Sequence, residues 1–133
     1  MFGPNGEEVD PDRAEVPGYR DQVIYINKQM IPLLQTIIAQ SATPPIIIVQ
    51  GDHGGVETSP IMRMHNLNAY YLPNGAEKQL YEKITPVNSF RVIFNSFFGG
   101  QFPLLKDTSY YSTYQDPYQF KIIPNTRKDC KGN

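Results

Sequence analysis

A chain of 133 residues has the usual size of one domain, so we expect a single compact unit over residues 1–133. Its content of 40% hydrophobic and 19% charged residues excludes a wholly disordered or collagen-like chain. A formal net charge of -1 argues against binding to nucleic acid or to an anionic membrane surface, and the longest apolar run, 46–49, is far too short to span a membrane.

Residues 1–17 combine turn-forming and acidic residues without a sustained period, which predicts an extended arm or loop. Over residues 19–42 the apolar side chains recur at helical spacing, so we predict an amphipathic helix there. Pro32 lies inside this stretch, where its ring removes a backbone donor and clashes with the carbonyl of Lys28. We therefore predict a kink or a break at Pro32.

Residues 46–50 form a β-branched run without polar alternation, which is typical of a strand buried on both faces. We predict a parallel strand here, followed at its carboxyl end by the polar loop Gly51-Asp52-His53-Gly54-Gly55. A helix, a buried strand and a polar loop in succession indicate an α/β fold.

Weaker patterns follow the loop. The pattern of residues 63–72 predicts a short strand or an irregular buried segment, and that of 76–84 predicts a short helix. Residues 86–98 predict a strongly apolar helix, because Thr85-Pro86 offers an N-cap with proline at the first helical position and Gly99-Gly100 a stop. For the rest of the chain we predict two short strands, 110–114 and 118–123, and a frayed tail, 124–133.

Asp52 and His53 stand where α/β folds place their ligand sites, directly after a strand. A carboxylate oxygen and an imidazole nitrogen suit zinc or manganese, whereas calcium or magnesium would need further oxygen ligands. The alternative is structural, with Asp52 in an Asx turn and His53 merely at the surface. Glu57, His65 and Asp107 are further side chains of suitable type, but none has a diagnostic spacing, and we expect each to be an ordinary loop or surface residue.

Four blocks stand in a fixed order along the chain: 18–22, 44–54, 68–73 and 85–91. Together they resemble a sulfatase-like branch of the alkaline phosphatase superfamily, and Asp52-His53-Gly54 is their most specific element. In that superfamily a metal-bound serine, threonine or formylglycine attacks a phosphate or sulfate ester. The resemblance implies that Asp52 and His53 are metal ligands, and that the fold is a partial alkaline-phosphatase-like one, with a few-stranded sheet and packed helices.

The resemblance also implies that the nucleophile and the remaining ligands lie upstream, on segments that this chain lacks. We therefore expect the C-terminal part of a metal-dependent phosphoester or sulfoester hydrolase or transferase, inactive alone. Helix faces left uncovered by a missing half would favour pairing with that half or with a second copy.

Two alternatives stay open. One is a non-catalytic module that associates with itself or with a partner, and the other is a complete small enzyme whose metal shell includes Glu57 or Asp107. Proteins similar to the suggested parent often work on the outer side of a membrane, whereas this segment itself is expected to be soluble.

Overall fold

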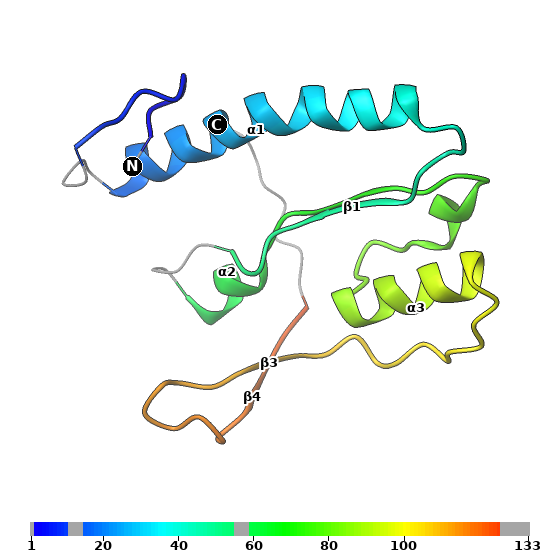
Figure 1. Cartoon of the computed structure of the whole chain (residues 1–133). Coiled ribbons are helices and arrows are strands. Elements are labelled where there is room, and N and C mark those ends of the chain that lie inside the picture. The colour runs from blue at the N-terminus through cyan, green and yellow to red at the C-terminus, as the bar shows by residue number, and fades with distance from the viewer. Residues whose placement is uncertain (1, 11–14, 55–58, 126–133) are drawn as a thin grey trace. The chain divides into compact units, whose positions relative to one another are not determined.

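The computed structural model describes residues 2–10, 15–54 and 59–125 (Figure 1). Its contacts form two units, Met1–Pro45 and Ile46–Asn133, and each is described by itself. The expectation of a single unit over 1–133 stays a prediction. None of the helices in the described ranges is both long enough and apolar enough to cross a membrane.

The first unit is dominated by one helix, α1 (Glu15–Gln40), which confirms the helix predicted over 19–42. The helix continues through Pro32, so of the predicted kink or break the break is wrong, while the kink stays a prediction. Proline removes only one of the many hydrogen bonds in a helix of 26 residues. The carbonyl of Pro32 also accepts a hydrogen bond from the Thr36 hydroxyl at 2.9 Å.

The N-terminal segment folds back on itself before α1. Phe2 and Glu8 form an isolated antiparallel bridge, and the Gly3 N–H donates to the carbonyl of Glu7 at 2.8 Å. The Phe2 ring lies 5.6 Å from the Tyr25 ring of α1, and its carbonyl accepts from the Gln22 side chain. The start of the chain is therefore attached to the first half of α1, and residues 11–14 of the predicted arm lie outside the described residues.

The second unit begins with β1 (Ile47–Gln50), which pairs with β2 (Asn68–Tyr71). The strand predicted over 46–50 is confirmed, and of the strand or irregular segment predicted over 63–72 the strand is confirmed for Asn68–Tyr71 only. The parallel orientation predicted for β1 is wrong, because the pairing is antiparallel and joins Ile47 to Tyr71. The residues of β1 are only partly buried. A continuous apolar run does not reveal strand direction, and here the intervening chain returns to pair with the same strand.

A second antiparallel pair, β3 (Ser109–Tyr111) and β4 (Lys121–Ile123), confirms the two strands predicted near the C-terminus, with shorter bounds. The chain is therefore a small protein of mixed helices and strands, with two small antiparallel sheets among the described residues. This agrees with an α/β protein only at that coarse level. Of the predicted tail, residues 126–133 lie outside the described residues.

The predicted helix over 86–98 is confirmed as α3 (Pro86–Phe97), with Thr85 at the N-cap and proline in the first turn. Gly99 adopts a φ of 66°, a left-handed conformation that ends helices at low cost for glycine. The buried core of the unit lies where α3 meets the sheet, at Leu72, Ala76 and Ile93. Five partly buried hydrophobic residues pack against it: Ile46, Ile48, Tyr70, Leu80 and Phe97.

The helix predicted over 76–84 is reduced to a 3-10 turn, η1 (Ala76–Gln79), so that prediction is wrong beyond Gln79. Leu80 has extended backbone angles. The chain then forms a turn in which the Ile84 N–H donates to the carbonyl of Tyr81 at 3.0 Å. This departure from a helix has a physical reason further along, because the Tyr81 hydroxyl donates to the carboxylate of Asp107 at 2.5 Å.

Candidate functional site

Asp52 and His53 lie in the loop that leaves β1, and the start of this loop is fixed by hydrogen bonds. The Gly51 N–H donates to the carbonyl of Leu67 at 2.9 Å, next to β2. The Gly51 carbonyl accepts from the side-chain amide of Asn66 at 2.8 Å. Both partners lie just before β2, so the strand pair determines where the Asp-His pair begins.

The far side of the loop rests on α2 (Pro60–Met64), a short helix that the sequence patterns did not reveal. Ser59 caps it by accepting from the N–H of Met62 at 3.2 Å, and Pro60 occupies its first turn. The Gly54 N–H donates to the carbonyl of Arg63 at 2.8 Å. A Cβ atom on Gly54 would overlap the carbonyl oxygens of Met62 and His65. Glycine is therefore required at this position for the loop to approach α2.

The imidazole of His53 is oriented by its own loop. Its Nδ1 lies 2.7 Å from the carbonyl oxygen of Gly54. Because a carbonyl oxygen only accepts, Nδ1 carries the proton, and in a neutral imidazole the lone pair is then on Nε2. Nε2 lies 3.6 Å from Oδ2 of Asp52. The loop thus brings an unshared nitrogen pair and a carboxylate oxygen together.

Asp52 also contacts the backbone of its neighbour. Its Oδ1 accepts from the N–H of His53 at 3.0 Å, while its side chain is 90% exposed and that of His53 35% exposed. An Asx turn uses the N–H two residues further on, so this contact differs from the structural alternative considered for Asp52. Among the described residues, the Asp52 side chain is thus open to solvent and that of His53 is partly so.

The two side chains fit a divalent metal as part of a coordination shell. Oxygen and imidazole nitrogen are ligands that zinc and manganese accept, and metal-bound histidines commonly donate their second ring N–H to a backbone carbonyl, as His53 does to Gly54. A complete protein site for zinc needs at least three ligands. Within the described ranges no three His, Cys, Asp or Glu side chains are grouped closely enough to hold an ion.

The other side chains considered as ligands do not join this pair in the described structure. His65 is the C-cap residue of α2 and contributes its backbone to the contact with Gly54. Glu57 lies outside the described residues. Asp107 is engaged elsewhere, at the N-terminus of α3.

Asp107 is the centre of a hydrogen-bond network. Its carboxylate accepts from the backbone N–H and hydroxyl of Thr85, from the Tyr81 hydroxyl and from the Asn88 side chain. Burial acts to raise the pKa of Asp107, but the hydrogen bonds from Thr85, Tyr81 and Asn88 outweigh it and lower that pKa. For Tyr81, burial and the hydrogen bond to Asp107 raise the pKa. A carboxylate that uses both oxygens in this way has a structural role.

The network also includes Asn88, which the sequence analysis did not single out. Its side chain is fully buried, donates to the carbonyl of Leu105 at 2.8 Å and accepts from the Leu105 N–H at 2.9 Å. The available signal was an asparagine in the first turn of the predicted helix, close behind the Thr85-Pro86 cap, but the helix has several other polar residues. That pattern does not identify the partner, which is 17 residues away.

Comparison of this chain with family models, with curated proteins and with solved structures gave no match. The resemblance to a sulfatase-like branch of the alkaline phosphatase superfamily therefore stays a prediction from the sequence blocks. The chemistry of the Asp52-His53 loop is the structural basis for a functional proposal.

Proposed function

We propose that this chain supplies the Asp-His half of a divalent metal site in a phosphoester or sulfoester hydrolase or transferase. The observation that carries the proposal is the contact between Nδ1 of His53 and the carbonyl of Gly54, at 2.7 Å. It fixes the ring tautomer so that Nε2, beside Asp52, has the lone pair that a metal requires.

The roles of the residues follow from their chemistry. Asp52 would contribute a negatively charged oxygen and His53 a neutral nitrogen, while Gly54 holds the loop against α2. A divalent ion supplies positive charge that stabilises an anionic ester during group transfer. The nucleophile and the remaining ligands would come from a part of the parent protein outside residues 1–133, so this chain alone would be inactive.

Metal binding tests the proposal directly. The isotope-labelled full chain is titrated with Mn²⁺, and the paramagnetic broadening of its resonances is followed by NMR. Zinc, calcium and magnesium are then compared for their ability to displace Mn²⁺. We expect broadening centred on residues 51–54. The chain should bind Mn²⁺ weakly, because only two protein ligands contribute. Asp52→Asn and His53→Gln should each abolish it.

His65→Gln is the matched control, because it removes the other histidine of the chain and leaves the Asp52-His53 pair intact. The proposal fails if broadening is absent, or if His65→Gln removes it as completely as His53→Gln. In a second assay, the chain alone should not hydrolyse nitrophenyl phosphate or nitrophenyl sulfate. Turnover that Asp52→Ala abolishes would instead support a complete small enzyme.

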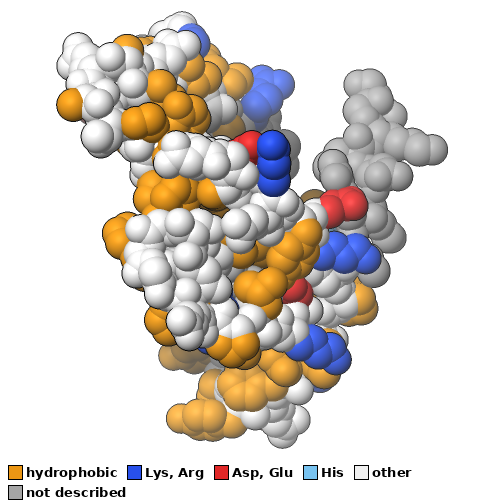
Figure 2. All heavy atoms as spheres, turned by 90° about the vertical axis from the view of Figure 1, so that its right-hand side faces the viewer, with side chains coloured by type: hydrophobic (Ala, Val, Ile, Leu, Met, Phe, Trp, Pro, Cys, Tyr) orange, Lys and Arg blue, Asp and Glu red, His pale blue; other side chains and the backbone are white. Residues whose placement is uncertain are grey.

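A second candidate function, a self-associating module, is favoured by a different observation. Four phenylalanines on and after α3 are between 44% and 67% exposed: Phe90, Phe94, Phe98 and Phe102. The rings of Phe98 and Phe102 lie 5.9 and 6.0 Å from that of Phe94. Hydrophobic side chains reach the surface in many places (Figure 2). Contiguous exposed aromatic surface of this kind commonly marks an interface, and the partner proposed here is a second copy of the chain.

A further inference from the structure

The tripeptide Pro-Asn-Gly occurs twice in the chain, at residues 4–6 and 73–75. An asparagine before a glycine can lose its side-chain amide without an enzyme. The backbone nitrogen of the glycine attacks Cγ of the asparagine, and the new N–Cγ bond closes a succinimide ring. The Cγ–Nδ2 bond breaks, and ammonia leaves with the proton of the attacking N–H. Water then opens the ring at either carbonyl, which gives aspartate or isoaspartate.

The first copy of the tripeptide is held by contacts on both reacting groups. Oδ1 of Asn5 accepts a hydrogen bond from Nζ of Lys28 at 2.6 Å. The N–H of Gly6, which would have to attack, donates to the carbonyl of Gly3 at 3.0 Å. The Tyr25 ring lies against Gly6, since a Cβ atom placed there would be 2.7 Å from Cε2 of the ring. Reaction at Asn5 must therefore break existing contacts before the nitrogen and Cγ can meet.

The second copy lies in the turn between β2 and η1, where the Asn74 side chain is exposed. Among the described residues, neither that side chain nor the Gly75 N–H has a hydrogen-bond partner. A Cβ atom placed on Gly75 would meet no atom of the described structure within 4 Å. The turn itself is closed by a long hydrogen bond, from the Ala76 N–H to the carbonyl of Pro73 at 3.3 Å. The two reacting groups are thus free to approach each other.

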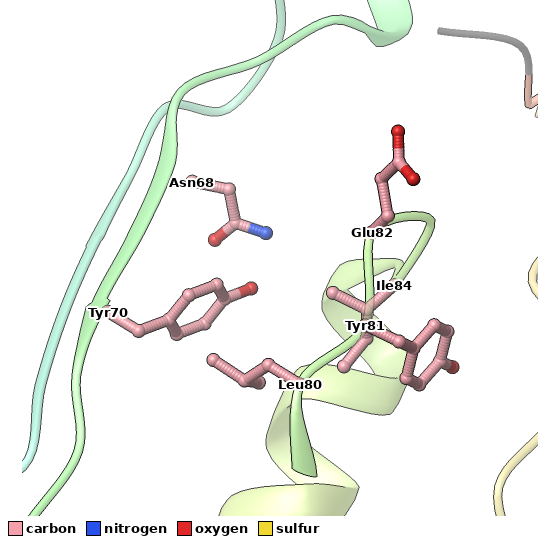
Figure 3. A pocket seen from close by; sticks show the side chains of 6 residues that line it. All are labelled: Asn68, Tyr70, Leu80, Tyr81, Glu82 and Ile84. Atoms are coloured by element: carbon pink, nitrogen blue, oxygen red, sulfur yellow. The ribbon is translucent and has the colours of Figure 1, made fainter. Parts of the chain in front are cut away.

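This turn joins two parts of the core of the second unit. Leu72 and Ala76, on either side of it, are buried. Tyr70 and Leu80, whose side chains approach each other in Figure 3, pack against the same cluster. Aspartate keeps the length of the backbone and tolerates the left-handed φ of 60° at Asn74. Isoaspartate instead lengthens the main chain by a methylene group, and so changes the distance between Leu72 and Ala76.

We propose that Asn74 is a site of spontaneous deamidation, with water as its co-reactant, and that the isoaspartate product loosens the core around this turn. Asn5, in the same tripeptide, is protected by its contact with Lys28 and by the hydrogen bond of the Gly6 N–H. The proposal does not depend on metal binding by Asp52 and His53, since neither residue belongs to the turn.

The two copies of the tripeptide allow a comparison within one molecule. The full chain is aged in mildly alkaline buffer, and peptide mapping by mass spectrometry follows the conversion of each asparagine. We expect Asn74 to convert about tenfold faster than Asn5, because reaction at Asn5 must first break a hydrogen bond to a charged group. In urea that unfolds the chain, the two rates should become similar. Equal rates in the folded chain, or a faster rate at Asn5, would overturn the proposal.

Lys28→Met tests the protection of Asn5. It should raise the rate at Asn5 toward that at Asn74 and leave the rate at Asn74 unchanged. Lys121→Met is the matched control, because it removes an exposed lysine on β4, in the other unit. Circular dichroism monitors folding in both variants. A rate at Asn5 that stays low in Lys28→Met, or that rises equally in Lys121→Met, would contradict protection by this contact.

The product is tested separately. Electron-transfer dissociation distinguishes aspartate from isoaspartate at position 74, and the two forms of the aged chain are separated by ion-exchange chromatography. The isoaspartate form should unfold at a lower urea concentration than the unaged chain. Asn74→Asp reproduces the other product and should unfold near the original midpoint. An unchanged midpoint for the isoaspartate form would overturn its effect on the core.

Discussion

Oδ1 of Asp107 accepts hydrogen bonds from both the backbone N–H and the hydroxyl of Thr85, at 2.7 and 2.6 Å. Thr85 is the N-cap residue of α3, but its side chain does not cap the helix by a hydrogen bond of its own. The carboxylate lies instead at this helix end, where the exposed N–H groups and the helix dipole favour negative charge. A loop residue 22 positions away therefore stabilises the start of α3.

Replacement of Asp107 by alanine should destabilise the protein. The variant leaves the partly buried N–H and hydroxyl of Thr85 without their acceptor, so we expect the free energy of unfolding to fall by about 1–3 kcal/mol. Urea denaturation followed by circular dichroism measures the change. Asp116→Ala, in the exposed turn between β3 and β4, is the matched control and should change it by less than about 0.5 kcal/mol.

The stability of the protein should depend on pH through the same carboxylate. The pKa of Asp107 in the folded protein lies below its ordinary value of 3.8, so its contribution is fully present above that value. The contribution is lost as pH falls through the lower, folded pKa. Urea midpoints measured between pH 5 and 2 should therefore decline less steeply for Asp107→Asn than for the unchanged chain, and parallel curves would contradict the assignment.

Tyr81 should limit stability at the alkaline end. Its pKa in the folded protein is raised above 10.0, so its contribution is present below the ordinary value and is lost as pH rises through the folded pKa. Tyr81→Phe cannot ionise and should remove this part of the decline, which denaturation curves between pH 9 and 12 would measure. Tyr118→Phe, at an exposed position, should leave the decline as it is.

The loop that carries Asp52 and His53 should be unusually sensitive at Gly54. Gly54→Ala places a Cβ against two backbone carbonyl oxygens, so either the loop or α2 must move, at a cost of about 1–3 kcal/mol. Gly51→Ala meets only ordinary contacts, the nearest at 3.6 Å, and serves as the control. Thermal unfolding should separate the two variants, and Mn²⁺ broadening should weaken in Gly54→Ala alone.

Self-association, if it uses the phenylalanine surface of α3, should respond to Phe94→Ser. Phe94 contacts the rings of Phe90, Phe98 and Phe102, so its removal divides the surface at its centre. Sedimentation velocity should show a shift from dimer toward monomer. Tyr114→Ser removes a ring that is 97% exposed and lies outside this surface, and it should leave the distribution unchanged.

Local signals in the sequence predicted the elements that depend on local interactions. The spacing of apolar residues indicated α1 and α3, and Thr85-Pro86 with Gly99-Gly100 indicated the bounds of α3. These signals come from residues a few positions apart, so the interactions they predict do not depend on how distant parts of the chain meet.

The errors concern contacts between distant residues. The run at β1 did not specify its antiparallel partner. After Gln79 the chain leaves the helix at Leu80 and turns over 81–84, where the hydrogen bond from Tyr81 to Asp107 overrides the helical pattern. The sequence identified Asp52 and His53 as a pair, but the orientation of His53 depends on how closely Gly54 approaches α2. The carboxylate of Asp107 could not be assigned to α3 from spacing, because its partners precede it by about twenty positions.

The side chain of Asn88 holds part of the chain after α3 in place, although this part forms neither helix nor strand. The Leu105 N–H donates to Asn88 and the Phe102 N–H donates to Asn95, at 2.9 and 2.8 Å. Two amides of a segment without regular secondary structure are thus tied to a helix by asparagine side chains. Their hydrogens should exchange with deuterium more slowly than those of neighbouring residues such as Gln101, and Asn88→Ala should accelerate exchange at Leu105 while Phe102 stays protected.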